Sequence, residues 1–341
     1  MSAVGLAPLR ASVVAGVPID DITLAETVDL VGSFVALGRS DCRTFQIATV
    51  NVDFVVKALR DNRASTILRQ AELCLPDGMP IIWYSRLLGT ALRTRVTGAD
   101  LVPALAARSA QTGHLILLFG SAPGVAEQAA ALLRANHPGA VVVGISGSRV
   151  SDDGTFDRRE LADLAAVDAD IICVALGNPK QEKWIDANRE SLRCPVLIGV
   201  GGTLDFLVGG RRRAPGWMQR HGLEWIFRAV QEPRRLGQRY VHDARIFGPL
   251  LASAAWRRLR APASATDRWS GSATKPTTGE FDASKVNCDD ERQIAVLVGW
   301  VRSARRAGER FRITGASKDL SELLSSLGCD TTTDFGPRGA S

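Results

Sequence analysis

The sequence predicts an α/β protein whose core is a Rossmann-like, mostly parallel sheet with helices on both faces. Short apolar runs rich in β-branched residues alternate with amphipathic stretches of helical length through residues 11–200. Gly and Pro bound most of these runs, as they do around buried strands. Hydrophobic residues make up 45% and charged residues 23% of the 341-residue chain, which is typical of a globular protein. A basic helical appendage and a small α/β tail domain are expected to follow the core.

The individual elements of the core can be assigned from this alternation. The expected strands cover residues 11–17, 44–51, 73–76, 114–119, 141–145, 171–176 and 196–200. The expected helices cover residues 23–37, about 52–68, about 79–88, 125–135 and 157–166, and two more begin near Asp100 and at Pro179. Because helical segments separate most of these strands, and parallel strands need such crossovers, the order favours a parallel sheet.

The stretch 169–210 marks the expected ligand-binding edge of this sheet. Asn178 suits a helix N-cap, Pro179 the first helical position, and Gln181 can reach back to the cap as in a capping box. This strand–turn–helix unit and the glycine turn at 199–202 lie at the carboxyl ends of strands, where open α/β folds bind ligands. The residues assigned to a site for a phosphate-bearing substrate there are Gln181, Glu182, Gly201 and Gly202.

A basic segment follows the last core strand. Residues 211–260 contain twelve arginines against the three acidic residues Glu224, Glu232 and Asp243. Such a block binds phosphates of a nucleotide, a nucleic acid or an anionic lipid. Nucleic acid is the least supported of the three, because aromatic residues are not interleaved at base-stacking intervals and no nucleic-acid-binding motif is present.

Residues 234–260 have apolar residues at roughly helical spacing with arginines between them. Gly248-Pro249 is expected to break or kink this helix. A basic amphipathic helix of this kind either lies on an anionic membrane surface or packs its apolar side on the domain as a solvated helix. Both interpretations stay open on the sequence alone.

The chain is predicted to divide into four parts. The core covers residues 1–210, the basic appendage 211–260, a linker rich in Ala, Pro, Ser, Thr and Gly 261–280, and a small α/β domain 281–341. In the last part, helices are expected at 293–307 and 320–327 and a strand at 311–314. A unit this short is marginal alone, so it is expected to dock on another surface.

The cysteines and the apolar runs bear on compartment. The six cysteines are scattered without a CxxC pair, which favours a reduced, cytosolic protein without a structural zinc. The N-terminus lacks the basic and apolar regions of a signal peptide, and no apolar run approaches the length of a spanning helix. We therefore expect a soluble protein of a reducing compartment that lies at most on the surface of a membrane.

Asp77 is the strongest candidate for a catalytic residue. It follows a strand in the sequence Leu75-Pro76-Asp77-Gly78, so its carboxylate faces the ligand edge and can take a proton from a hydroxyl. Asp-Gly is also common in plain turns, and that alternative stays open.

Two further motifs carry weaker signals. Asp168-Ala169-Asp170 matches the Asp-x-Asp pattern with which many sugar transferases hold a metal, but it precedes a strand and so lies at the amino edge; we interpret it as a solvated turn. Residues 120–124 resemble a glycine turn for phosphate, without the Lys-Ser/Thr of a P-loop or a GxGxxG motif. Without a metal, arginines and helix N-termini must meet the charge of a departing diphosphate, which favours a metal-independent transferase.

Taken together, these segments resemble the WecG/TagA/CpsF glycosyltransferases over residues 11–240. The matching blocks are TVN at 49–51, LPDG at 75–78, RVTGADL at 95–101, FGSAPGVAE at 119–127, ALGNPKQEKWI at 175–185, IGVGGTLDFLVGG at 198–210, RAPGWMQRHGLEWIFR at 213–228 and EPRRLGQRY at 232–240. The ordered set is far more specific than any single block.

The resemblance implies an inverting transfer of a sugar from a UDP-sugar to a polyprenyl-diphosphate-linked saccharide in cell-surface polysaccharide synthesis, by a cytoplasmic protein peripherally associated with the inner face of the cell membrane. No metal and no cofactor are expected, because the residues offer no convincing metal site. The donated sugar is N-acetylmannosamine, its uronic acid, glucose or glucuronic acid. Matched residue by residue, Asp77 is the general base. The residues implied to bind substrate are Thr49, Asn51, Arg95, Gly98, Gln181 and Asp205, with Arg228, Arg235 and Arg239 of the appendage on the diphosphates.

The tail departs from that family. Its sequence resembles the later part of a STAS domain without the first strands, which implies a regulatory or protein-docking module, with a degenerate spacer as the alternative. Two alternative functions are disfavoured. A catalytically inactive nucleotide-sugar-binding scaffold is disfavoured by the retained Asp77 and Gln181. A dehydrogenase is disfavoured by the absence of GxGxxG.

Overall fold

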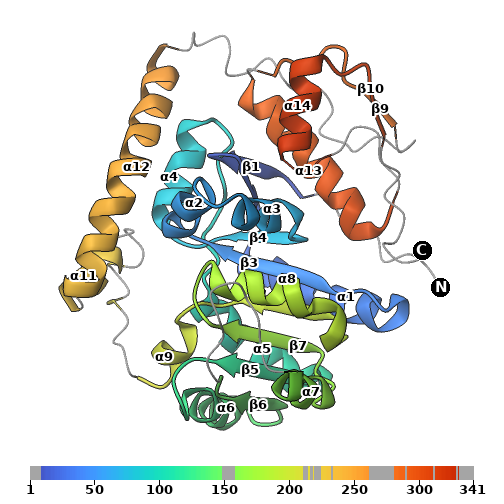
Figure 1. Ribbon diagram of the computed structural model, residues 1–341, viewed down its shortest axis with the longest axis vertical. Coiled ribbons are helices and arrows are strands. Elements are labelled where there is room, and N and C mark those ends of the chain that lie inside the picture. The colour runs from blue at the N-terminus through green and yellow to red at the C-terminus, as the bar shows by residue number, and fades with distance from the viewer. Residues whose placement is uncertain are drawn as a thin grey trace.

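The computed structural model confirms the predicted α/β fold, in which a six-stranded parallel sheet lies between helices (Figure 1). It describes residues 9–147, 158–209, 214–215, 218, 224–231, 233–260, 280–288, 290–309, 312–327 and 329. The sheet strands are β3 (Phe45–Val50), β4 (Leu73–Pro76), β5 (Ile116–Gly120), β6 (Val142–Ile145), β7 (Ile171–Ala175) and β8 (Val196–Gly199). Their order across the sheet is β4-β3-β8-β7-β5-β6, and every described neighbouring pair is parallel.

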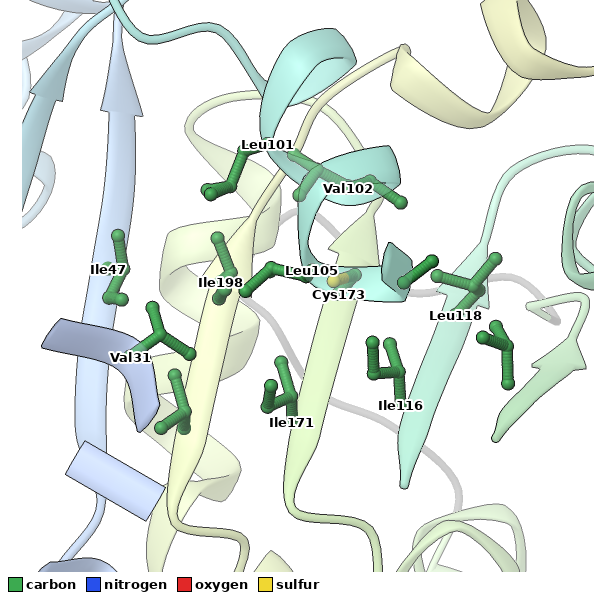
Figure 2. Close-up of a cluster of buried hydrophobic side chains, with 14 of the residues drawn as sticks. Val31, Ile47, Leu101, Val102, Leu105, Ile116, Leu118, Ile171, Cys173 and Ile198 are labelled. Atoms are coloured by element: carbon green, nitrogen blue, oxygen red, sulfur yellow. The ribbon is translucent and has the colours of Figure 1, made fainter. Parts of the chain in front are cut away.

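Helices cover both faces of the sheet. They are α1 (Leu24–Asp41), α2 (Val52–Ala58), α3 (Asn62–Gln70), α4 (Met79–Leu87), α5 (Gly98–Thr112), α6 (Val125–Asn136), α7 (Arg158–Ala166), α8 (Lys180–Leu192) and α9 (Thr203–Leu207). On one face α1, α5 and α6 bury aliphatic side chains against the strands (Figure 2). On the other face α2, α3, α7 and α8 do the same. Burial on both faces explains why the strands are continuous apolar runs.

The N-terminal strand expected over residues 11–17 is instead a hairpin. β1 (Ala11–Val14) pairs antiparallel with β2 (Val17–Asp20), and Ala15 and Gly16 make the turn with φ of 49° and 79°. Two consecutive positive φ angles are typical of the tight turn that suits a two-residue hairpin. Gly16 supplies that conformation without strain, whereas Ala15 gives no turn signal in the sequence.

Two helix predictions also need correction. The single helix expected over about 52–68 is split into α2 and α3, and the side chain of Asp61 caps α3 by accepting a hydrogen bond from the Ala64 N–H. The capping box expected at Asn178 is absent from α8. A cis peptide bond joins Asn178 to Pro179, and Pro179 occupies the N-cap without a side-chain hydrogen bond.

The basic appendage forms two helices, α11 (Glu224–Gln231) and α12 (Pro233–Arg260). The break expected at Gly248-Pro249 does not occur, and α12 runs through Pro249 as one long helix (Figure 1). Phe247 and Ala254, on either side of Pro249, are buried in the core cluster that includes α2 and α4. This packing outweighs the local preference of proline for a helix end.

The tail docks on the N-terminal hairpin of the same chain (Figure 1). It consists of β9 (Glu280–Asp282), α13 (Glu291–Ala307), β10 (Arg312–Thr314) and α14 (Lys318–Ser326), and β9 pairs parallel with β10. Arg302 and Arg306 of α13 reach the buried carboxylate of Asp20 in β2, with N···O distances of 2.8 and 2.9 Å. Arg257 of α12 pairs with Glu291 at 2.9 Å, so α13 contacts the appendage as well.

Candidate functional site

A polar cavity of about 620 Å³ lies at the carboxyl edge of the sheet. The loops after β3, β4, β5, β7 and β8 line it, together with the first turn of α5 and Arg239 of α12. β5 leads outward to β6, whereas β7 leads to β8 on the other side, so the chain diverges between these two strands. Open α/β sheets bind ligands at such a switch point.

A second cavity of about 330 Å³ opens beside the first, between α4 and α12. Its wall is largely apolar, with Met79, Pro80 and Trp83 from α4 facing Phe247 and Leu251 from α12. The two cavities share Asn51, Asp53, Asp77 and Arg239. A polar and an apolar compartment therefore meet at one group of charged and amide side chains.

Asp77 lies at this junction, as its position after β4 predicts. Its backbone N–H donates to the Val50 carbonyl at 2.9 Å, which extends the β3–β4 pairing by one residue beyond the strand. The next residue, Gly78, has φ of 111° and is the N-cap of α4. The turn fixes the direction of the Asp77 side chain, which is partly buried and lines both cavities.

Thr49 and Asn51 lie on the β3 side of the polar cavity, and both have structural partners. The Thr49 hydroxyl donates to the Gly199 carbonyl at 2.8 Å, tying the ends of β3 and β8 together. The Asn51 side-chain oxygen caps α2 by accepting from the Phe54 N–H at 3.0 Å. These bonds hold both residues at the cavity wall.

Gln181 and Glu182 behave differently from one another. Gln181 lines the polar cavity, accepts from the Gly201 N–H at 2.9 Å and donates to Glu182 Oε1 at 2.7 Å. Glu182 is fully buried behind it, outside the cavity lining, and its Oε2 has no hydrogen-bond partner in the described part of the chain. Burial raises the pKa of Glu182 to about 8. Glu182 therefore orients the Gln181 amide rather than lining the cavity, contrary to its predicted role.

The glycine turns let backbone approach closely at the cavity. Gly201 has φ of 58°, and Gly202 lies beside it on the cavity wall. A Cβ at Gly98, the first residue of α5, would lie 2.6 Å from Thr203 Oγ1, so only glycine fits there. Asp205 lines the same wall and accepts a hydrogen bond from the Ser121 hydroxyl at 3.0 Å.

Two of the four predicted arginines line the cavities. Arg95 lines the apolar cavity and pairs with Glu224 of α11 at 2.7 Å, which fixes α11 against the core. Arg239 lines both cavities, and its side chain is 3.9 Å from the Asp53 carboxylate. The side chains of Arg228 and Arg235 lie outside the described residues.

Three site residues were missed from the sequence: Asp53, Lys57 and Asp243. Lys57 Nζ donates to Asp53 Oδ2 at 2.8 Å, and to the side-chain and main-chain oxygens of Asn178 at 2.9 and 3.1 Å. Asp243 is buried one helical turn after Arg239. The Asp53–Lys57 and Arg239–Asp243 spacings of four residues are the signals that could have placed each pair on one helix face.

The Asp-x-Asp motif lies at the amino edge of the sheet, as interpreted. Arg39 binds Asp168 and Asp170 at 2.6 and 2.9 Å, and the Asp170 side chain accepts from the Leu115 N–H at 2.8 Å. Among the described residues, no group of three or more His, Cys, Asp or Glu side chains is arranged to hold a metal ion. No described helix is both long and apolar enough to span a membrane.

The parallel sheet and the polar cavity at its switch point define a Rossmann-like ligand-binding protein. The family model described as "Glycosyl transferase WecG/TagA/CpsF family" matches residues 12–261 of this chain. Two N-acetylglucosaminyldiphosphoundecaprenol N-acetyl-beta-D-mannosaminyltransferases are similar to it. The protein from Bacillus spizizenii is 33% identical over 190 residues, and that from Bacillus subtilis 31% over 189 residues; each match covers 55% of this chain and 72% of the relative. The chain belongs to the WecG/TagA/CpsF glycosyltransferase family.

Proposed function

We propose that this protein transfers N-acetylmannosamine from a UDP-sugar to a polyprenyl-diphosphate-linked saccharide. The observation that carries the proposal is the meeting of a polar and an apolar cavity at Asp77. The polar cavity suits a nucleotide-sugar, because Arg239 and the α5 N-terminus supply donors for its phosphates and Lys57 adds a positive charge at the wall. The apolar cavity suits the first isoprene units of the acceptor.

The names of the two relatives support this choice of sugars. Both enzymes are named for transfer of N-acetylmannosamine to N-acetylglucosaminyl-diphosphoundecaprenol. N-Acetylmannosaminuronic acid, glucose and glucuronic acid are the alternative donor sugars to be compared in the same assay.

In the proposed reaction Asp77 is the general base. An acceptor hydroxyl attacks the anomeric carbon of the donor, and the new C–O bond forms as the bond from that carbon to the diphosphate oxygen breaks. The Asp77 carboxylate takes the hydroxyl proton, and UDP leaves with the bonding electron pair. Attack opposite the leaving group inverts the anomeric centre.

The departing diphosphate is met by fixed positive groups rather than by a metal ion. Arg239 and Lys57 lie at the cavity wall, and the N-terminus of α5 points its first N–H groups there through residues 97–99. Neither a divalent metal nor a cofactor has a role in this scheme. Gln181, held by Glu182 and the Gly201 N–H, presents an oriented amide to the donor.

We further propose that α12 lies on the cytoplasmic face of the cell membrane. Val241, Trp256 and Leu259 are 52%, 57% and 82% exposed, and helical spacing puts them on the side opposite the buried Asp243 and Phe247. Exposed arginines accompany them on α12. Apolar and basic side chains together are typical of a helix at a lipid–water interface.

The test is a transfer assay with purified full-length protein. The protein is mixed with UDP-N-acetylmannosamine and a prenyl-diphosphate-linked N-acetylglucosamine. UDP release is measured, and the mass of the lipid product is determined by mass spectrometry. We expect acceptor-dependent UDP release and a product heavier by one N-acetylhexosamine. The other three UDP-sugars serve as matched donors. Absence of acceptor-dependent UDP release with all four donors would contradict the proposal.

A further inference from the structure

Four charged side chains gather where the two cavities meet. Asp53 and Lys57 come from α2, and Arg239 and Asp243 come from α12. Lys57 holds Asp53 at 2.8 Å and also binds Asn178 in the loop after β7. Arg239 approaches the same Asp53 carboxylate at 3.9 Å. This cluster connects the helix that closes the apolar cavity to the loop that lines the polar one.

Asp243 is the member of this cluster whose burial the fold does not explain. It is 5% exposed, it lines the apolar cavity, and its Oδ1 is buried without a hydrogen-bond partner among the described residues. Burial and the nearby charge of Asp53 raise the pKa of Asp243 to about 6, while Arg239 and Lys57 act in the opposite direction. A buried carboxylate oxygen without a partner destabilises a fold. Such a group is expected where a ligand supplies the missing donor.

Arg239 offers a hydrogen-bond donor that complements this acceptor. Its Nε is buried and also has no hydrogen-bond partner in the described structure. Arg239, Asp243 and Phe247 follow each other at intervals of four residues and so lie on one face of α12. This face therefore offers a guanidinium donor and a carboxylate acceptor side by side, next to an apolar wall.

The chemistry of the lipid-linked acceptor substrate determines which of its parts can hydrogen-bond to Asp243. A carboxylate oxygen only accepts hydrogen bonds. The prenyl chain has no polar hydrogen, and the diphosphate is an anion that a carboxylate repels. The sugar is the part that carries hydroxyl and amide N–H donors.

We propose that Asp243 and Arg239 form the subsite for the sugar of the lipid-linked acceptor. Asp243 Oδ1 accepts a hydrogen bond from a hydroxyl or amide N–H of that sugar, and Arg239 Nε donates one to a sugar oxygen. This proposal rests on the proposed function and deepens it, because it makes Asp243 a specificity-determining residue. Asp53, fixed by Lys57, holds the Arg239 guanidinium beside this subsite.

The experiment compares two ligands that differ only by the sugar. Farnesyl diphosphate and farnesyl-diphosphate-linked N-acetylglucosamine are titrated into full-length wild type and Asp243→Leu by calorimetry. We expect Asp243→Leu to weaken binding of the sugar-bearing ligand on the order of tenfold to a hundredfold, as for loss of a hydrogen bond to a charged group. Farnesyl diphosphate should bind both proteins alike. Asp163→Leu, at an exposed carboxylate on α7, is the matched control.

A thermal melt separates this role from a structural one. Replacing a buried carboxylate that lacks a partner by a leucine of similar size should raise the Tm, whereas loss of a structural contact should lower it. Equal weakening of both ligands, or unchanged affinity for the sugar-bearing one, would overturn the subsite while leaving wild-type transfer intact. A wild type that transfers no sugar overturns the proposed function, and the subsite with it.

Discussion

Replacing Asp20 by asparagine should destabilise the whole molecule, although Asp20 lines neither cavity. Asp20 is fully buried, and its carboxylate accepts from Arg302, from Arg306 and from the Cys74 N–H. Burial by itself would raise the pKa of Asp20; the two arginines outweigh it and keep the pKa below its ordinary value of 3.8. The carboxylate is therefore ionised in the folded protein, and asparagine removes the countercharge of two buried guanidinium groups.

The magnitude follows from this burial. Breaking a buried ion pair by removing one partner costs about 3–5 kcal/mol, because the other charge stays buried. Here two arginine side chains, each 2% exposed, lose the same partner. For a chain of 341 residues this loss corresponds to a fall in Tm of roughly 4–7 °C. Asp20 has a lowered folded-state pKa, so its contribution is present above the ordinary pKa and is lost as the pH falls through the folded-state value.

The assay is urea unfolding of wild type and Asp20→Asn at pH 7, followed by circular dichroism. Asp29→Asn is the matched control, because Asp29 pairs with Arg108 at the surface and such pairs contribute at most about 1 kcal/mol. The combined replacement of Asp20, Arg302 and Arg306 by leucine and methionines should recover most of the loss. If Asp20→Asn is as stable as Asp29→Asn, the buried network does not hold the tail in place.

Four further predictions concern the site and the appendage. Asp77→Asn should bind the donor nearly as wild type and lose about 10²–10⁴ in transfer rate; near-normal turnover would remove Asp77 from the mechanism. Transfer should persist in EDTA, and a loss that Mg²⁺ or Mn²⁺ restores would show a metal requirement. The pKa of Glu182 is raised from 4.5 to about 8, so the folded protein favours the neutral carboxyl group. The free energy of unfolding should therefore fall as the pH rises towards 8, by roughly 2–3 kcal/mol between pH 6 and 8.5. Glu182→Gln should abolish this pH dependence in denaturant titrations. The double substitution Trp256→Glu and Leu259→Glu should weaken flotation with anionic liposomes, whereas Leu132→Glu on α6 should not.

The parallel core was predictable because its signals are local and agree with one another. The apolar strand runs, the helix periodicity and the glycine turns each indicate the same alternation, and the structure follows it. The corrections fall where tertiary packing or backbone conformation overrides the local signal. Ala15 adopts a positive φ that alanine rarely takes, and α12 continues through Pro249 because its neighbours are buried against α2 and α4.

The site was predictable at the strand ends and not on the helices that flank it. Asp77 and Gln181 follow strands, so the carboxyl-edge rule locates them without knowledge of tertiary structure. Lys57 and Asp243 lie inside helices, where a charged residue usually faces solvent. Lys57 reaches the polar cavity by its contact with Asn178, and Asp243 reaches the apolar one by the packing of α12 on α2; the sequence carries no direct sign of either contact.

The buried contact of Asp20 with the tail constrains when the chain can complete its folding. Arg302 and Arg306 follow Asp20 by 282 and 286 residues. During synthesis the N-terminal hairpin therefore emerges long before the charges that neutralise its carboxylate. The sheet strands from β3 to β8 can assemble in the meantime, because domains fold as units from the N-terminus. Docking of α13 must follow synthesis of residue 306, so a chain that ends before residue 302 contains Asp20 without either of the arginines that neutralise it.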